Sequence, residues 1–182
     1  MSQDFYLGNP NLKKVGTEIQ FTKDQIQEYL KCKEDPVYFA MTYIKIISLD
    51  EGIVPFKMWD FQQELIESFH ENRFNIAKLP RQTGKSTTCV SYLLHYILFN
   101  DNVNVGILAN KLSTARDLLG RLQLAYEQLP LWIQQGIVVY NKGSMELENG
   151  SKILAASTSA SAVRGMSFNI IFLDEFAFIP NH

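Results

Sequence analysis

Short apolar stretches alternate with longer amphipathic ones between residues 74 and 173. Apolar positions at steps of three and four predict helices over 85–99 and 112–129. Short apolar stretches predict strands at 74–79, 103–109, 137–140, 144–147, 153–156 and 169–173. Asn149-Gly150, between two of these strands, is a strong hairpin signal. Alternating strands and helices predict an α/β fold with a mostly parallel sheet flanked by helices.

The N-terminal part of the chain follows a different pattern. Its opening residues are aperiodic and predict an arm or loop, whereas Thr22 suits a helix N-cap and Pro36 suits the first turn of a helix. Helices are predicted at 23–33 and 36–46, and a further one holds the helically spaced Trp59, Gln62, Ile66 and Phe69. We therefore expect an arm and small helical cap over residues 1–55 and a core domain over 56–182.

Composition narrows the class of protein. The chain has 182 residues, of which 46% are hydrophobic and 20% charged, which suffices for one sizeable core. Its net charge of −2 provides no global basic field, so any grip on nucleic acid must be local. Cys32 and Cys89 have no neighbours at metal-ligand spacing. Neither a signal peptide nor a long apolar run is present, so we expect a soluble intracellular protein.

The segment Leu79-Pro80-Arg81-Gln82-Thr83-Gly84-Lys85-Ser86 lies between a predicted strand and a predicted helix. A phosphate-binding loop needs inward backbone N–H groups at a helix start, a lysine for the phosphates and a hydroxyl for Mg²⁺. Gly84, Lys85 and Ser86 supply these groups. The usual pattern has a second glycine where Leu79 stands, so a plain strand-to-helix turn with a solvated lysine is the alternative for this segment alone.

Two carboxylates follow the last predicted strand, at Asp174 and Glu175. Open parallel sheets place ligands at the carboxyl ends of their strands. Asp174 would hold a metal ion and Glu175 would polarise the attacking water, which are the two tasks of phosphoryl transfer to water. An exposed turn is the alternative for this pair alone, but together with Gly84-Lys85-Ser86 it favours a nucleotide hydrolase.

Other residues have both a functional and a structural interpretation. Arg81 would neutralise charge on the γ phosphate, or is simply solvated. Phe61 and Gln62 would stack on adenine and read its edge, or belong to the helix core and surface. Arg164 would act on a neighbouring subunit's nucleotide or on DNA, or forms a loop salt bridge. We interpret three further residues as structural: His70, Cys89 and His95.

With these residues in place, the sequence resembles the ATPase domain of the large subunit of phage terminase, the motor that packages DNA into tailed-phage proheads. The resemblance begins at about Phe56 and extends to the last residue. Its matching segments are 59–62, 79–86, 106–109, 141–144, 146–147, 162–165, 167–168 and 177–181. Terminases tolerate Leu at the position of Leu79.

The resemblance implies a role for each matched residue. The ATP-binding residues would be Phe61, Gln62, Pro80, Arg81, Gln82, Thr83, Gly84, Lys85, Ser86 and Thr87. The catalytic residues would be Arg81, Lys85 and Glu175, with Ser86 and Asp174 as Mg²⁺ ligands and Arg164 as a trans-acting arginine. Gln62 would contact adenine.

The resemblance also implies ATP and Mg²⁺ as cofactors and double-stranded DNA, a small terminase subunit and a portal protein as partners. A homo-oligomeric ring in the host cell cytoplasm is expected. The fold class would be the P-loop NTPases with a catalytic Glu after the Walker B Asp, in which a central strand comes later in the chain. We therefore expect a fragment that is poorly stable and weakly active alone, whose full-length parent carries a C-terminal nuclease domain.

Two other functions fit parts of the sequence. A helicase-type ATPase also combines a Gln ahead of the loop with a Gly-Lys-Ser and an Asp-Glu strand, although Phe176 and Ala177 here replace the usual helicase residues. A regulatory nucleotide-binding module is the second alternative. Glu175 argues against that module, since binding alone needs no water activator.

Overall fold

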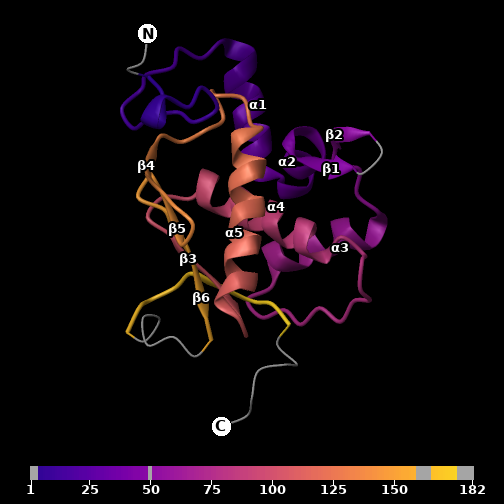
Figure 1. Cartoon of the computed structure of the whole chain (residues 1–182). Coiled ribbons are helices and arrows are strands. Elements are labelled where there is room, and N and C mark those ends of the chain that lie inside the picture. Colours follow the sequence, from indigo (N-terminus) through magenta and orange to yellow (C-terminus); the bar gives the residue numbers. More distant parts are fainter. Residues whose placement is uncertain (1–3, 49–50, 159–164, 176–182) are drawn as a thin grey trace.

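The computed structural model describes residues 4–48, 51–158 and 165–175, which form a mixed α/β fold (Figure 1). The helices are η1 Tyr6–Gly8, α1 Lys23–Glu34, α2 Pro36–Tyr43, α3 Asp60–Glu71, α4 Lys85–Phe99 and α5 Leu112–Glu127. The strands are β1 Lys45–Ser48, β2 Gly52–Pro55, β3 Asn104–Ala109, β4 Ile137–Tyr140, β5 Ser144–Leu147, β6 Lys152–Ser157 and β7 Ile170–Leu173. No helix in these ranges is long and apolar enough to cross a membrane.

The main sheet has five strands in the order β4-β5-β6-β3-β7. Strand β3 pairs in parallel with both β6 and β7, whereas β5 runs antiparallel to β4 and β6. All of these strands except β5 therefore run in one direction, which confirms the predicted mostly parallel sheet. The predicted hairpin is also confirmed, because Gly150, with φ of 80°, lies in the turn between β5 and β6.

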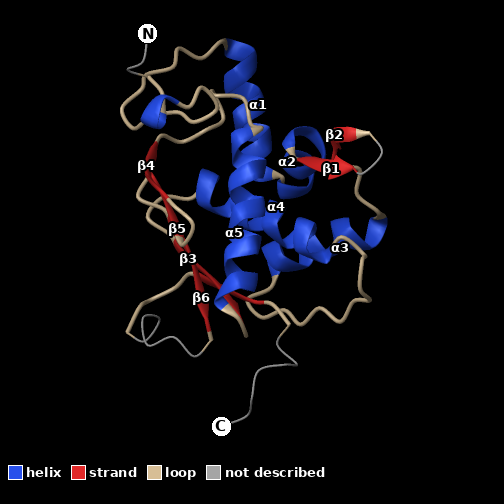
Figure 2. Ribbon diagram, viewed as in Figure 1, coloured by secondary structure: helices blue, strands red, loops and turns tan. Residues whose placement is uncertain are grey.

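The long helices lie on one side of this sheet (Figure 2). Helices α4 and α5 pack on β3, and α5 also packs on β6. Val105, Ile107 and Ile153 are fully buried in these strands. The apolar core is continuous from Phe39 of α2 to Ile153 of β6, so the helical cap packs directly on the core.

The predicted second helix is too long at its C-terminal end. Helix α2 ends at Tyr43, and residues 45–48 instead form β1, which pairs antiparallel with β2. The sequence at the switch is Ile44-Lys45-Ile46-Ile47, and β-branched residues favour the extended backbone of a strand. A short hairpin therefore follows the helix where a further helical turn was expected.

The strand predicted over Phe74–Leu79 is wrong. These residues have no regular structure, and Phe74 and Ile76 are 84% and 101% exposed. An extended segment becomes a strand only when a neighbour pairs with its N–H and C=O groups. None of the sheet pairings among the described residues includes this segment. Apolar character alone therefore misled the assignment.

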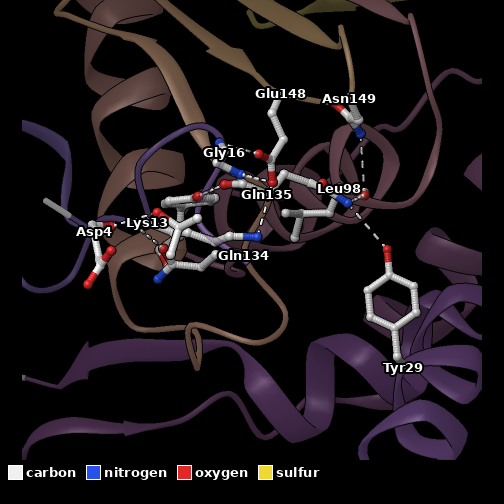
Figure 3. A network of polar contacts seen from close by, with 12 residues as sticks. Asp4, Lys13, Gly16, Tyr29, Leu98, Gln134, Gln135, Glu148 and Asn149 are labelled. Carbon is white, nitrogen blue, oxygen red and sulfur yellow. Dashed lines mark hydrogen bonds and ion pairs between the residues drawn. The ribbon is translucent and has the colours of Figure 1, made fainter. Parts of the chain in front are cut away.

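The N-terminal arm is attached to the far end of the sheet through Glu148 (Figure 3). Its carboxylate accepts hydrogen bonds from the Lys13 ammonium at 3.0 Å and from the N–H groups of Gly16 at 3.1 Å and Gly136 at 2.6 Å. The Ile137 N–H of β4 also donates to the Lys13 carbonyl at 2.8 Å. The arm therefore lies against the start of β4. Without it, backbone N–H and C=O groups at this edge of the sheet would be exposed.

The amide side chain of Gln134 reinforces this attachment (Figure 3). Its oxygen accepts from the Lys13 N–H, and its nitrogen donates to the Asn11 carbonyl, both at 3.0 Å. Because Gln134 is 2% exposed, these bonds form away from water and hold the arm's backbone directly.

His95 is a residue of α4 that faces the helical cap. Its ring is 2% exposed, and its Nε2 lies 2.8 Å from the Cys32 carbonyl of α1. A carbonyl only accepts, so Nε2 donates and Nδ1 is the unprotonated nitrogen, which has no hydrogen-bond partner. Burial lowers the pKa of His95 to about 4. His95 is thus structural, as interpreted from the sequence.

We predict that Glu148→Ala loosens the arm. Three donors would lose their acceptor, which costs roughly 2 kcal/mol of unfolding free energy. Faster proteolysis or amide exchange within residues 4–18 would report it. Glu146→Gln is the control, because the Glu146 carboxylate pairs with the half-exposed Lys152 and such surface pairs contribute little. Equal effects in the two variants would contradict this account.

The stabilisation that the Glu148 carboxylate provides depends on pH. Burial alone would raise the pKa of Glu148, but hydrogen bonds from Gly136, Gly16 and Lys13 outweigh it and hold this pKa below its usual range. The stabilisation is therefore present above the usual glutamate pKa and disappears as the pH falls through the lowered folded value.

A second prediction concerns mild acid. Because the pKa of His95 falls on folding to about 4, the unfolded chain binds more protons between that value and about pH 6.5. Stability should therefore decrease as the pH falls from 6.5 to 4, by roughly 3 kcal/mol. Urea unfolding at stepped pH values measures it. His95→Gln retains a donor for the Cys32 carbonyl and should flatten the curve in that window; an unchanged slope would refute the assignment.

Candidate functional site

The parallel strands of the sheet end at a common edge. Leu108 is opposite Leu173, and Ala109 is opposite Ser157, so β3, β6 and β7 finish within one or two residues of one another. The Asp174 N–H donates to the Leu108 carbonyl at 2.9 Å. This bond continues the ladder one residue beyond β7 and fixes the position from which the Asp174 side chain extends.

The loop over residues 79–86 leads into α4. Gly84 precedes the helix with φ of 72°, and Gln82 has φ of 61°. Left-handed residues alternating with others along a loop turn successive N–H groups toward one side and make a concave, anion-attracting backbone. Gly84, the N-cap residue, has no side chain to cap α4, and the first N–H groups of a helix have no partners within it. The loop and helix start therefore offer donors to an anion.

A charged contact joins this loop to the sheet edge. The Lys85 Nζ lies 3.6 Å from the Asp174 Oδ1. The Asp174 side chain is 9% exposed and the Lys85 side chain 33%, so the carboxylate is buried and the ammonium reaches solvent. A buried carboxylate requires such a partner. Two groups far apart in the sequence are thereby brought to one place, as their proposed roles require.

The remaining predicted residues have different surroundings. Ser86 and Thr87 are half-buried in the first turn of α4, beside Lys85. Arg81 and Glu175 are exposed, and Glu175 has a left-handed backbone with φ of 51°. Such backbone strain in a non-glycine residue often accompanies functional sites. Pro80 is exposed, with its carbonyl accepting from the Thr83 hydroxyl. Arg164 lies outside the described residues.

Gln62 is connected to the loop in a way that sequence reasoning missed. Its Nε2 donates to the Thr83 carbonyl, and its Oε1 accepts from the Trp59 N–H, both at 3.0 Å. A glutamine at the third position of a helix is half of the capping-box signal, whose other half, Ser or Thr at the N-cap, is replaced here by Trp59. The contact with Thr83 had no sequence signal. Phe61 is half-buried, with its ring centroid 5.6 Å from that of Trp59.

Cys89 lies one turn along α4 from Lys85. It is 3% exposed, and burial raises the pKa of its thiol to about 12, with the charge of Asp174 adding to the rise. A thiol with this pKa carries almost no thiolate at neutral pH and is not a nucleophile. Its structural interpretation therefore agrees with its surroundings.

The oxygen atoms of side chains around the loop suit a Mg²⁺ ion that is coordinated in part by a bound phosphate group. No group of three His, Cys, Asp or Glu side chains that could hold a metal occurs within the described ranges. Mg²⁺ commonly uses one or two carboxylates together with phosphate oxygens and water. Asp174 and the Ser86 hydroxyl, near the concave backbone of the loop, fit that pattern.

Comparison with known proteins shows a likeness both to a protein family and to a solved structure. Residues 76–182, more than half of the chain, match the model of the family described as terminase large subunit, T4likevirus-type, N-terminal. The crystal structure of the HK97 bacteriophage large terminase is similar over 82% of this chain, with a TM-score of 0.67 and 17% identity. The chain spans 32% of that protein's length. At this identity the structural likeness concerns the fold.

We predict that Gln82→Gly stabilises the chain. A left-handed backbone costs a non-glycine residue such as Gln82 about 1–2 kcal/mol, and glycine removes this cost. Part of the gain is offset because glycine increases the conformational entropy of the unfolded chain. A net gain of about 0.5–1 kcal/mol in unfolding free energy is expected. Gln82→Ala is the control, because alanine also pays the left-handed cost. A glycine variant no more stable than the alanine variant would show that the loop is unstrained.

Proposed function

The chain belongs to the terminase large subunit family, T4-like N-terminal type, and from this premise we propose that it binds and hydrolyses ATP to drive DNA into a prohead. The observation that carries the proposal is the 3.6 Å contact between the Lys85 Nζ and the Asp174 Oδ1. It places a cationic loop and a buried carboxylate at one edge of the sheet, where open α/β sheets bind ligands.

Phosphate binding is assigned to the loop and the start of α4. The left-handed Gln82 and Gly84 shape the backbone, and the uncapped N-terminus of α4 adds donors with a positive dipole end. Lys85 would leave Asp174 to contact the β and γ phosphates. Pro80, Thr83 and Thr87 complete the proposed contacts, and base selection by Phe61 and Gln62 stays a prediction.

The hydrolytic step is assigned to residues on both sides of this contact. Mg²⁺, when bound, would neutralise charge on the phosphates. Asp174 and Ser86 would hold it. Glu175, exposed beside Asp174, would orient the attacking water and accept its proton, and Arg81 would stabilise charge on the γ phosphate. In fold terms this is the P-loop class with a catalytic Glu after the Walker B Asp.

The proposed partners follow from the family. They are double-stranded DNA, a small terminase subunit and a portal protein, with a homo-oligomeric ring as the working assembly in the host cytoplasm. A trans-acting Arg164 belongs to the same proposal. With a net charge of −2, the chain would contact DNA through a local surface. A nuclease activity would reside in another part of the full-length protein.

We predict that Glu175→Gln retains ATP binding and loses hydrolysis. Removing a general base costs roughly 10²–10⁴ in rate, whereas the neutral amide leaves the phosphate contacts in place. DNA-stimulated phosphate release and ATP affinity, both measured on the full-length protein, separate the two effects. Asp117→Asn, an exposed acid of α5, is the matched control and should behave as the parent. Undiminished hydrolysis in the Glu175 variant would remove its catalytic role.

Packaging and unwinding are separated by a second assay. ATP-dependent protection of DNA inside purified proheads is the expected activity of the full-length protein with its partners. Strand separation without such protection would favour the helicase-type alternative. ATP binding with no turnover under either condition would favour a regulatory module.

A further inference from the structure

The carboxamide of Gln62 joins the first turn of α3 to the phosphate-binding loop. Its oxygen accepts from the Trp59 N–H and its nitrogen donates to the Thr83 carbonyl, both at 3.0 Å. The residue is 5% exposed. Because one end of the amide must accept and the other must donate, these two bonds fix it in a single orientation.

The loop backbone closes tightly against this amide. A Cβ on Gly84 would lie 2.5 Å from the Gln62 Nε2, closer than real contacts allow, and the left-handed φ of 72° also disfavours a side chain there. The amide therefore fills the space that the missing side chain leaves. Gly84 serves the close approach of Gln62 as well as the turn.

The bond to Thr83 determines which way the next N–H group points. In a trans peptide the C=O and the following N–H lie in one plane and point in opposite directions. Since the Thr83 carbonyl points toward Gln62, the Gly84 N–H points away from α3. That N–H is among the loop donors that the proposed function assigns to phosphate.

We infer that Gln62 is a positioning residue for the phosphate-binding loop and acts on phosphate binding whatever base the nucleotide carries. The inference rests on the proposed ATP-binding function. The amide keeps a second N–H and a second lone pair, but the two bonds fix its orientation and the residue is only 5% exposed. The alternative assignment, base recognition by Gln62, therefore requires this buried amide to become accessible to the base.

The test compares ligands with and without a base. Gln62→Met retains the length and packing of the side chain and removes both hydrogen bonds. Calorimetric titration of the full-length protein with MgATP, MgGTP and Mg-tripolyphosphate should give roughly five- to tenfold weaker binding for all three, by a common factor. A loss confined to MgATP would overturn the inference, as would unchanged affinity for tripolyphosphate.

A second variant tests the Thr83 contact itself. In Gln62→Glu, the ionised carboxylate still accepts from the Trp59 N–H but cannot donate to the Thr83 carbonyl, whereas the protonated form can. At pH 8 the variant should bind tripolyphosphate more weakly than the parent protein does. The ratio of the two affinities should approach one as the pH falls from 8 to 5. Gln63→Glu places the same charge one residue along, and its affinity ratio to the parent should not track pH in this way. Equal pH profiles for the two variants would overturn the inference.

These outcomes are distinct from failure of the proposed function. If the parent protein binds none of the three ligands, the proposed function and the inference both fall. If the parent binds all three and Gln62→Met binds them equally well while melting at the parent's temperature, only the positioning role is overturned.

Discussion

Because β7 pairs in parallel with β3, its last residue leaves the sheet at the same edge as the ends of β3 and β6. The Asp174 N–H continues that ladder by donating to Leu108, and its carboxylate then meets Lys85. Shifting β7 by one residue would turn the Asp174 side chain to the other face. Strand register therefore determines whether the acid and the loop can meet, and every proposed catalytic role depends on that meeting.

The segment over residues 74–79 shows what pairing adds to sequence pattern. Its apolar residues resemble those of β3, which was predicted within one residue, but β3 has a strand on each side while Phe74 and Ile76 lie in solvent. In β7, which pairs on one side only with a strand of the described residues, Ile171 and Leu173 are also exposed. Apolar pattern reports which segments favour burial, whereas sheet membership depends on a partner elsewhere in the chain.

In the candidate site, features with a local sequence signal could be predicted, whereas contacts between distant segments could not. The positions of Gly84 before α4 and of Asp174 after β7 could be predicted from sequence because the strand, turn and helix signals are local. The contacts of Gln62 with Thr83, Glu148 with Lys13, and His95 with Cys32 join distant segments. No propensity encodes such pairs, and they emerge only once the core brings their elements together. The β1–β2 hairpin was missed for a different reason, since β-branched residues there overrode a helical continuation.

The Gln62 contact joins α3 to the loop that the proposed function assigns to phosphate. At its N-terminal end α3 holds the loop through Gln62, and toward its C-terminal end the Tyr92 hydroxyl of α4 donates to the Phe69 carbonyl at 3.0 Å. Helix α3 also packs on α2 of the cap. A displacement of α3 along α4 would have to stretch one of these bonds, and the loop end is where the backbone already has two left-handed residues. The proposed phosphate-binding loop, α3 and the helical cap are therefore joined in one series of contacts.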